Sequence, residues 1–297
     1  MFFNKSLYLH YNFAKTNCEM KNHISYPLTI IVLVFILFSC SDQSVEKKEQ
    51  ETKTEAIEPQ DEVGTEDFYF FLPSPIQIAH ILKRSGLLFS AEWINDPAKY
   101  DQYQTRTAGL LNLGVYTGDL AYCILNDRTE ESLKYINSIK KLSDKLDMSE
   151  IYYSDNTMTR IESAVNNKDS LVNFIISTQE NLSDYAYSSN QLSILMITFA
   201  GAWVETVYIG AHADNESPER VGETLSEEMG ILKNLIDGLE STVQDNPEIS
   251  TLTTQLKDFE QKMYSRDGEN KPINFSSDQI EILKKEIAII RNNITNN

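Results

Sequence analysis

The sequence is poor in the residues with which enzymes most often hold metals or build nucleophilic sites. It has four histidines and three cysteines in 297 residues. The motifs His-Glu-x-x-His, Gly-x-Ser-x-Gly and Cys-x-x-Cys are absent, and so is a P-loop. The Glu-x-x-His pairs of di-iron helical bundles are also missing. The sequence therefore predicts no catalytic residue, no metal ligand set and no cofactor.

Basic residues are too few for a protein that binds nucleic acid. The chain has 26 Lys and Arg residues against 44 Asp and Glu residues, a formal net charge of -18 at pH 7. Nucleic-acid binding depends on Lys and Arg side chains that neutralise phosphates, so nucleic acid is not an expected partner. The same charge argues against electrostatic docking on anionic lipid. An acidic surface mainly confers solubility.

Glycine and proline are sparse, at 11 and 8, and the alternation typical of strands is missing. Apolar residues instead recur at helical spacing, and Ser-Pro, Asn-Pro and Ser-Ser-Asp stretches mark helix starts. The sequence predicts an all-α domain at 67–297, a multi-helix bundle of about nine helices, with tetratricopeptide-like or solenoid-like packing as an alternative. The expected helices are 75–85, 96–126, 129–142, 155–166, 169–187, 190–213, 218–241, 247–265 and 277–294.

A short apolar run near the N-terminus indicates a membrane anchor of a particular kind. Leu28 to Phe38 is too short to cross a bilayer, which needs about 20 apolar residues. Its length, and Lys21 before it, fit a signal peptide. The next residues, Leu37-Phe38-Ser39-Cys40, resemble the lipobox of bacterial lipoproteins. The resemblance implies that residues 1–39 are removed and that Cys40 carries palmitate-type acyl chains, which tether the protein to a membrane.

The segments on either side of the apolar run complete this prediction. A start at Met20 would give a signal peptide of conventional length, so Met20 is the expected start. An uncleaved signal anchor is the alternative. Residues 40–66 contain nine acidic residues and no aromatic residue, a composition typical of a disordered stalk. The start at Ser41-Asp42 resembles that of surface-exported Bacteroidota lipoproteins, which implies an outer-membrane location, facing the periplasm or the outside.

Two stretches within the expected helices, 109–126 and 190–214, are apolar nearly all round, so these helices should lie at the centre of the bundle. On the first helix, Gly114 and Gly118 share one side and allow a neighbouring helix to come close. A lone cysteine in that helix, Cys123, is expected to be an inert apolar residue. Each helix also carries one polar stripe. The stripes consist of Asn112, Tyr116 and Asp119 on the first helix, and of Thr198, Glu205, Tyr208 and His212 on the second.

These stripes are the candidate site. A buried aspartate has to find a partner, change its pKa or face a cavity. If the stripes face each other, Asp119 and Glu205 can share a proton or pair with His212 or an arginine. One interpretation is a buried small-molecule or metal pocket, as found in helical bundles. The other is a structural role, either a hydrogen-bonded network that fixes helix register or stripes that face solvent. The network is the favoured interpretation.

Two stretches, "LPSPIQIAHILKRSG" and "LNLGVYTGDLAYC", resemble an uncharacterised family of helical lipoproteins from Bacteroidota, over roughly residues 68–215. The resemblance implies a location and no activity. The predicted function is a membrane-tethered, non-enzymatic lipoprotein whose helical domain binds an envelope protein or a small ligand. The alternative is a metal- or cofactor-dependent enzyme that uses Asp119, Glu205 and His212.

Overall fold

The computed structural model describes residues 88–153, 161, 167–212, 218–243, 245–264 and 275–296. These residues belong to one compact unit, Asp61–Asn297. They form helices and turns and no strand, so the all-α prediction is confirmed. The elements are η3 (Pro97–Asp101), α3 (Arg106–Leu125), α4 (Thr129–Lys145), α5 (Ser149–Tyr152), α7 (Lys168–Ser188), α8 (Leu192–Ala211), α9 (Pro218–Thr242), α10 (Pro247–Tyr264) and α11 (Ser277–Thr295).

Several sequence predictions lie outside the described residues. They are the signal peptide at 1–39, the stalk at 40–66, the helix at 75–85 and nearly all of the helix at 155–166. Structure therefore bears on the predictions only from residue 88 onward.

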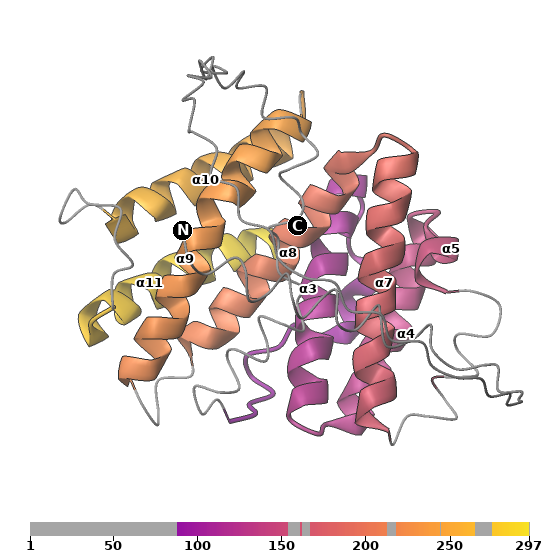
Figure 1. Cartoon of the computed structure of the whole chain (residues 1–297), viewed down its shortest axis with the longest axis horizontal. Helices are drawn as coiled ribbons and strands as arrows, with labels where there is room; N and C mark the ends of the chain where they lie inside the picture. The colour runs from indigo at the N-terminus through magenta and orange to yellow at the C-terminus, as the bar shows by residue number, and fades with distance from the viewer. Residues whose placement is uncertain are drawn as a thin grey trace, which may run out of the picture. The chain divides into compact units, whose positions relative to one another are not determined.

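The helices α3 and α8 form the centre of the bundle (Figure 1). Both are long and apolar enough to cross a membrane, but 94% and 83% of their most apolar windows are buried inside the domain. A buried core helix can have the same length and composition as a membrane span, so the length and apolarity of α3 and α8 do not argue for a membrane span. The predicted central position of both helices is confirmed.

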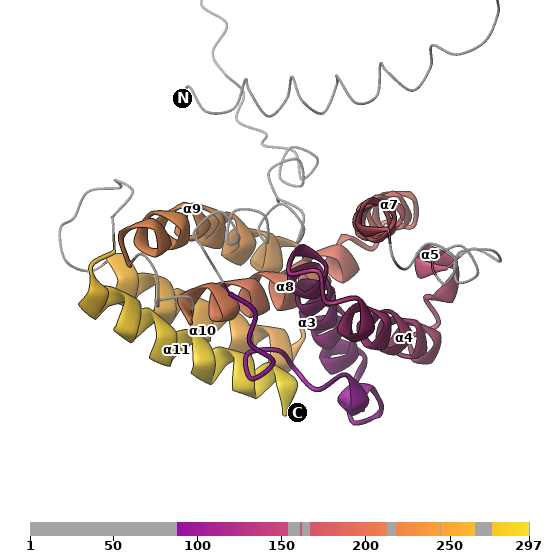
Figure 2. The ribbon, with the colours of Figure 1, turned by 90° about the horizontal axis from the view of Figure 1, so that it is seen from below.

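The remaining helices pack on two sides of the central pair. The group α9, α10 and α11 covers one side, and α4, α5 and α7 cover the other (Figure 2). The C-terminal helix α11 contacts both α3 and α8. In a solenoid each repeat contacts only its sequence neighbours. The described helices instead pack against partners far along the chain, which is bundle packing.

Glycines let the central helices touch through their backbones. A Cβ atom added to Gly114 would lie 1.9 Å from the carbonyl oxygen of Thr198, and one added to Gly201 would lie 1.9 Å from that of Leu111. No side chain fits at either position, because real Cβ atoms never come this close to an oxygen. The close approach expected at Gly114 is therefore present, and Gly201 contributes to it from the other helix.

The helix predicted at 96–126 is wrong at its start. The structure has a 3-10 helix at Pro97–Asp101, and α3 begins only at Arg106. Between them Thr105 is extended, and its hydroxyl accepts a hydrogen bond from the amide of Ala108. A threonine in this conformation is an N-cap, which ends the preceding segment and starts a new helix.

Candidate functional site

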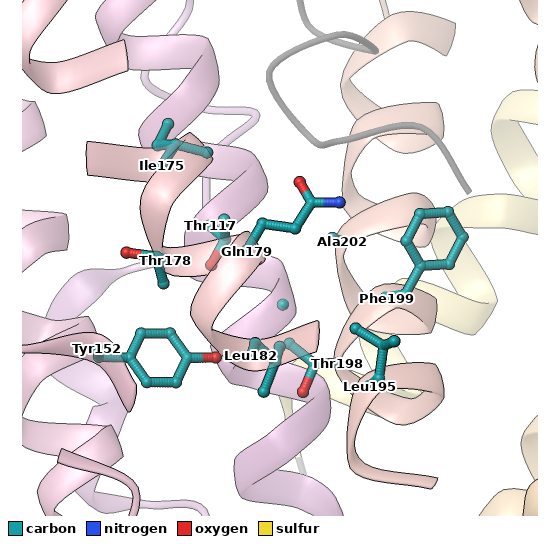
Figure 3. Close-up of a pocket in the computed structure, with 11 residues that line it drawn as sticks. Thr117, Tyr152, Ile175, Thr178, Gln179, Leu182, Leu195, Thr198, Phe199 and Ala202 are labelled. Carbon is teal, nitrogen blue, oxygen red and sulfur yellow. The ribbon is translucent and has the colours of Figure 1, made fainter. Parts of the chain in front are cut away.

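A partly open pocket, the cavity beside α8, lies between α7 and α8, and α3 and α5 also contribute lining residues (Figure 3). The two flanking helices are joined by a tight turn in which Asn190 has a positive φ of 55°, a conformation that asparagine tolerates. The cavity has a volume of about 40 Å³. Its wall is formed by Gly114, Thr117, Tyr152, Ile175, Thr178, Gln179, Leu182, Leu195, Thr198, Phe199 and Ala202.

Three side-chain oxygen atoms in this wall have no hydrogen-bond partner among the residues that the structure describes. They are the hydroxyl oxygens of Thr178 and Thr198 and the side-chain oxygen of Gln179. Both threonines are 6% exposed. By contrast, the hydroxyl of Thr117, in the same wall, donates to the carbonyl of Leu113 over 2.8 Å. These three oxygens are buried within the packing around the pocket, and the surface of the pocket itself is largely apolar.

A second hollow, of about 720 Å³, is more open and lies between the segment around η3 and α4. Its wall carries both signs of charge, from Glu131, Lys134 and Lys141. The ammonium of Lys141 also lies 4.6 Å from the ring centre of Tyr100. This surface has the volume of a ligand site without the enclosure of the cavity beside α8.

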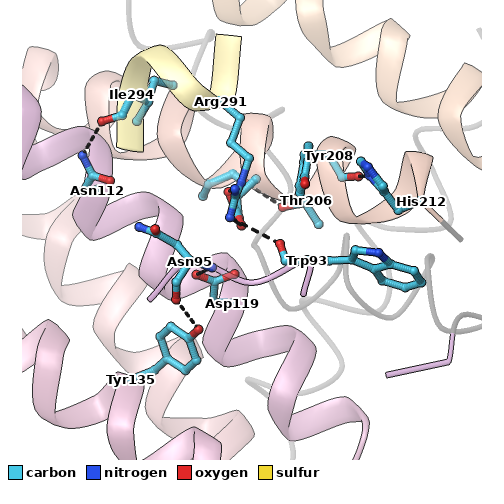
Figure 4. Close-up of polar contacts among 12 residues, drawn as sticks. Trp93, Asn95, Asn112, Asp119, Tyr135, Thr206, Tyr208, His212, Arg291 and Ile294 are labelled. Atoms are coloured by element: carbon cyan, nitrogen blue, oxygen red, sulfur yellow. Dashed lines mark hydrogen bonds and ion pairs between the residues drawn. The ribbon is translucent and has the colours of Figure 1, made fainter. Parts of the chain in front are cut away.

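The predicted polar stripes meet in the interior, where Glu205 of α8 pairs with Arg291 of α11. The guanidinium of Arg291 donates to both carboxylate oxygens of Glu205, from Nε over 2.7 Å and from Nη2 over 2.8 Å. Figure 4 shows Arg291 with its contact to Trp93 and with Asp119 close by. Glu205 is 0% exposed and Arg291 is 8% exposed. The carbonyl of Trp93 accepts a further hydrogen bond from Arg291 over 3.3 Å, and the guanidinium lies 4.3 Å from the ring centre of Tyr208.

Asp119 of α3 adds a second carboxyl group to this pair. Burial raises its pKa well above the ordinary 3.8; the charge of Glu205 raises it further, whereas Arg291 opposes the shift. Its Oδ2 accepts from the amide of Asn95 over 3.2 Å, while Oδ1 accepts no hydrogen bond. Because a raised pKa favours the protonated form, a protonated Asp119 could donate to the carboxylate of Glu205, which is one of the groups that raise its pKa. The cluster is then neutral: one carboxylate, one guanidinium and one carboxylic acid.

Tyrosines hold the segment before α3 over Asp119. Tyr135 donates to the carbonyl of Asn95 over 2.5 Å, and the side chain of Asn95 donates to Tyr103 over 2.9 Å. Tyr116 donates to the carbonyl of Asp96 over 3.1 Å and lies 3.4 Å from the hydroxyl of Tyr103. Burial raises the pKa of all three tyrosines, so they act as neutral hydrogen-bond donors and acceptors.

The other stripe residues lie away from the carboxyl pair. Asn112 donates to the carbonyl of Ile294 over 2.8 Å and so connects α3 to α11. His212 ends α8, where its Nδ1 lies 2.7 Å from the carbonyl oxygen of Tyr208 and its ring packs on Tyr208 with 4.3 Å between centres. Thr198 lines the cavity beside α7. Of the seven predicted residues, Tyr208 lies against Arg291 and Tyr116 lies among the tyrosines around Asn95, near Asp119 and Glu205, whereas Asn112, Thr198 and His212 lie elsewhere.

Sequence reasoning missed Arg291, although a signal for it exists. Residues 280, 283, 287, 291 and 294 follow one face of the last helix, and all are apolar except Arg291. An arginine on a buried face requires an acidic partner, and the two buried carboxyl groups were already predicted. Asn95, Tyr103 and Tyr135 carry no comparable signal.

Cys123 lies in the same helix as Asp119 and is fully buried. Burial raises the pKa of its thiol, and the charge of Asp119 adds to the effect. A thiol with a raised pKa is a poor nucleophile, which agrees with the inert role that was expected.

In comparisons with known proteins, no protein-family model, curated protein or solved structure matches this chain. The function has to be argued from the residues and their geometry.

Proposed function

We propose that this chain is a lipoprotein of the bacterial cell envelope, anchored in the outer membrane through acyl chains on Cys40, with a helical domain that binds a ligand or partner and catalyses no reaction. The lipobox Leu37-Phe38-Ser39-Cys40, directly after an apolar run of signal-peptide length, is the observation that carries the proposal. Two or three acyl chains hold a protein firmly on a membrane, so the helical domain needs no membrane contact of its own.

The buried cluster supports a non-enzymatic domain. Both oxygens of Glu205 bond to Arg291, and Asp119 bonds to the backbone of Asn95. A general acid or base has to reach a substrate, whereas these groups are occupied by the protein itself. Their arrangement fits the hydrogen-bonded network that connects α3, α8 and α11.

The cavity supports binding. It lies beside the central pair and its surface is largely apolar. The hollow beside η3 and α4, of about 720 Å³, has the volume of a ligand site and both signs of charge in its wall. For the alternative of a metalloenzyme, no group of three His, Cys, Asp or Glu residues within the described ranges is placed to hold a metal ion.

Labelling with palmitate tests the anchor. Cells that express the full chain are grown with labelled palmitate, and the label is followed in wild type, Cys40→Ala and Cys123→Ala. The last variant is the matched control, because Cys123 is buried in α3. We expect label in wild type and Cys123→Ala and none in Cys40→Ala. An unlabelled wild type, or a Cys40→Ala variant that still carries label, would contradict the proposal.

A further inference from the structure

The hollow beside η3 and α4 lies between two stretches of chain that run in the same direction. Four contacts join these stretches, and each step along residues 95–101 is matched by a step along α4. The contacts are Tyr135 to the carbonyl of Asn95 over 2.5 Å, Ser138 to that of Pro97 over 2.7 Å, Lys145 to that of Asp101 over 3.0 Å, and Lys141 to the ring centre of Tyr100 over 4.6 Å. The lining residues come from 91–100 and 131–141, so the hollow follows α4 and has two ends.

A lysine lies toward each end of this hollow. Lys134 and Lys141 both line it, and both are exposed. They are seven residues apart, which places them on one face of α4 and about 10 Å apart along its axis. Neither ammonium forms an ion pair with a carboxylate of the described residues, whereas Lys140 and Lys145 of the same helix do. In a chain with a net charge of -18, two neighbouring lysines without acidic partners are a local exception.

The acidic residues of the same wall already have partners. Glu131 accepts a hydrogen bond from Arg128 over 2.8 Å, which lowers the pKa of Glu131. Asp96 is the N-cap of η3, where its side chain accepts from the amide of Ala98 over 2.8 Å. The charged groups of the lining that remain without a partner are therefore the two ammonium groups. A ligand that contacts both ends of the hollow needs an anionic group at each end.

The lining between the two lysines is mostly apolar or already bonded. Pro97 and Ala98 present apolar atoms there, and the hydroxyl groups on this stretch of α4 donate to carbonyls of the opposite wall. Asn137 adds a single amide. The volume of about 720 Å³ falls in the range of small-molecule sites. An aliphatic chain between two anionic groups matches this composition.

We propose that the hollow beside η3 and α4 binds a linear dicarboxylate, whose two carboxylate groups pair with Lys134 and Lys141 while its aliphatic middle lies between them. A separation of about 10 Å between the carboxylates matches two turns of helix. The inference rests on the proposed binding function and names its ligand class. It is tested separately from the anchor, because palmitate labelling of Cys40 does not depend on what the hollow holds.

The test is isothermal titration calorimetry of the full chain in phosphatidylcholine nanodiscs at low salt, with empty nanodiscs as the blank. The ligand is nonanedioate, and nonanoate is the control ligand that lacks one of the two carboxylates. Wild type is compared with Lys134→Gln and Lys141→Gln. Lys140→Gln is the matched control, because it removes the same charge from the same helix but Lys140 pairs with Asp144 over 2.8 Å and does not line the hollow.

We expect saturable binding of nonanedioate to wild type, with one ligand for each protein. Each of Lys134→Gln and Lys141→Gln should weaken the affinity about three- to fivefold, the effect of one exposed ion pair, while Lys140→Gln stays within about twofold. Nonanoate should bind wild type about three- to fivefold more weakly than nonanedioate, because it forms only one of the two pairs.

Three results would overturn the inference. The absence of saturable heat with nonanedioate would mean that the hollow takes no such ligand. An equal loss of affinity in Lys140→Gln would mean that the variants report only the net charge of the chain. Equal affinity for nonanoate and nonanedioate would mean that only one end of the hollow is used. None of these results bears on the anchor.

Discussion

Glu205 and Arg291 are 86 residues apart in the sequence and form a two-point ion pair in the interior, with N–O distances of 2.7 and 2.8 Å. Asp119 lies beside this pair, and burial raises the pKa of its carboxyl group. The cluster joins the two central helices to the C-terminal helix at one place. Its strength depends on complete pairing, because an isolated charge in the interior is far more costly than a satisfied one.

Removal of one partner of this pair should destabilise the protein strongly. Arg291→Met leaves Glu205 buried without its counter-charge, and Glu205→Leu does the same to Arg291; each should lower the free energy of unfolding by about 3–5 kcal/mol. The double variant should cost less than either single change, because no charge is left unpaired. Denaturant unfolding of the four proteins measures this coupling. Costs that simply add would show that the two residues act independently.

Asp119→Asn should stabilise the protein, and the gain should grow with pH. The raised pKa means that folded Asp119 keeps a proton which the unfolded chain releases above its ordinary pKa of 3.8. The contribution of Asp119 to stability is therefore fully present below that pH and is lost as pH rises toward the folded pKa, by up to about 1.4 kcal/mol per pH unit. Asparagine can replace the protonated acid, because its amide donates to Glu205 and its oxygen accepts from Asn95.

Unfolding of wild type and Asp119→Asn from pH 4 to pH 9 measures that difference. Near pH 4 the two proteins should have similar free energies of unfolding. As the pH increases, the free energy of unfolding of wild type should become lower than that of Asp119→Asn. A difference that is independent of pH would mean that Asp119 is not held as an acid in the folded state.

Alanine at Gly114 should force the central helices apart. Its Cβ would lie 1.9 Å from the carbonyl oxygen of Thr198, and overpacking of this kind costs about 1–3 kcal/mol or more. Gly230→Ala is the matched control, since a Cβ there meets nothing within 4 Å; it should be neutral or stabilise by about 0.5–1 kcal/mol, as alanine favours the helix. Thermal unfolding distinguishes the two. Similar effects at both positions would contradict the backbone contact between α3 and α8.

Valine at Thr178 or Thr198 should stabilise the unliganded protein, because it removes a buried hydroxyl without a hydrogen-bond partner. Each substitution should raise the free energy of unfolding by about 1–2 kcal/mol. Thr117→Val should have the opposite sign, because it removes a hydrogen bond to Leu113. Denaturant midpoints measured without added ligand give both values. A destabilised Thr178→Val or Thr198→Val would show that the hydroxyl has a partner inside the protein.

The sequence was a good guide to the centre of the fold and a partial one to the site. Uniform apolarity identified α3 and α8 as central helices. Asp119 and Glu205 lie close together, as expected if the polar stripes of the two helices face each other. Thr198, Glu205 and His212 share a helix face, but each is seven residues from the next, which is about 10 Å along the axis. A common face therefore did not make a common site. Asn95, Tyr103 and Tyr135 reach the cluster through tertiary packing, for which helical periodicity has no signal.

The most direct test of the account is the intact mass of the protein extracted from native membranes, combined with identification of its first residue. The account predicts a chain that begins at Cys40 and carries the added mass of two or three acyl chains on that residue. A chain that still begins at Met1 or Met20, with no acyl mass, would contradict it.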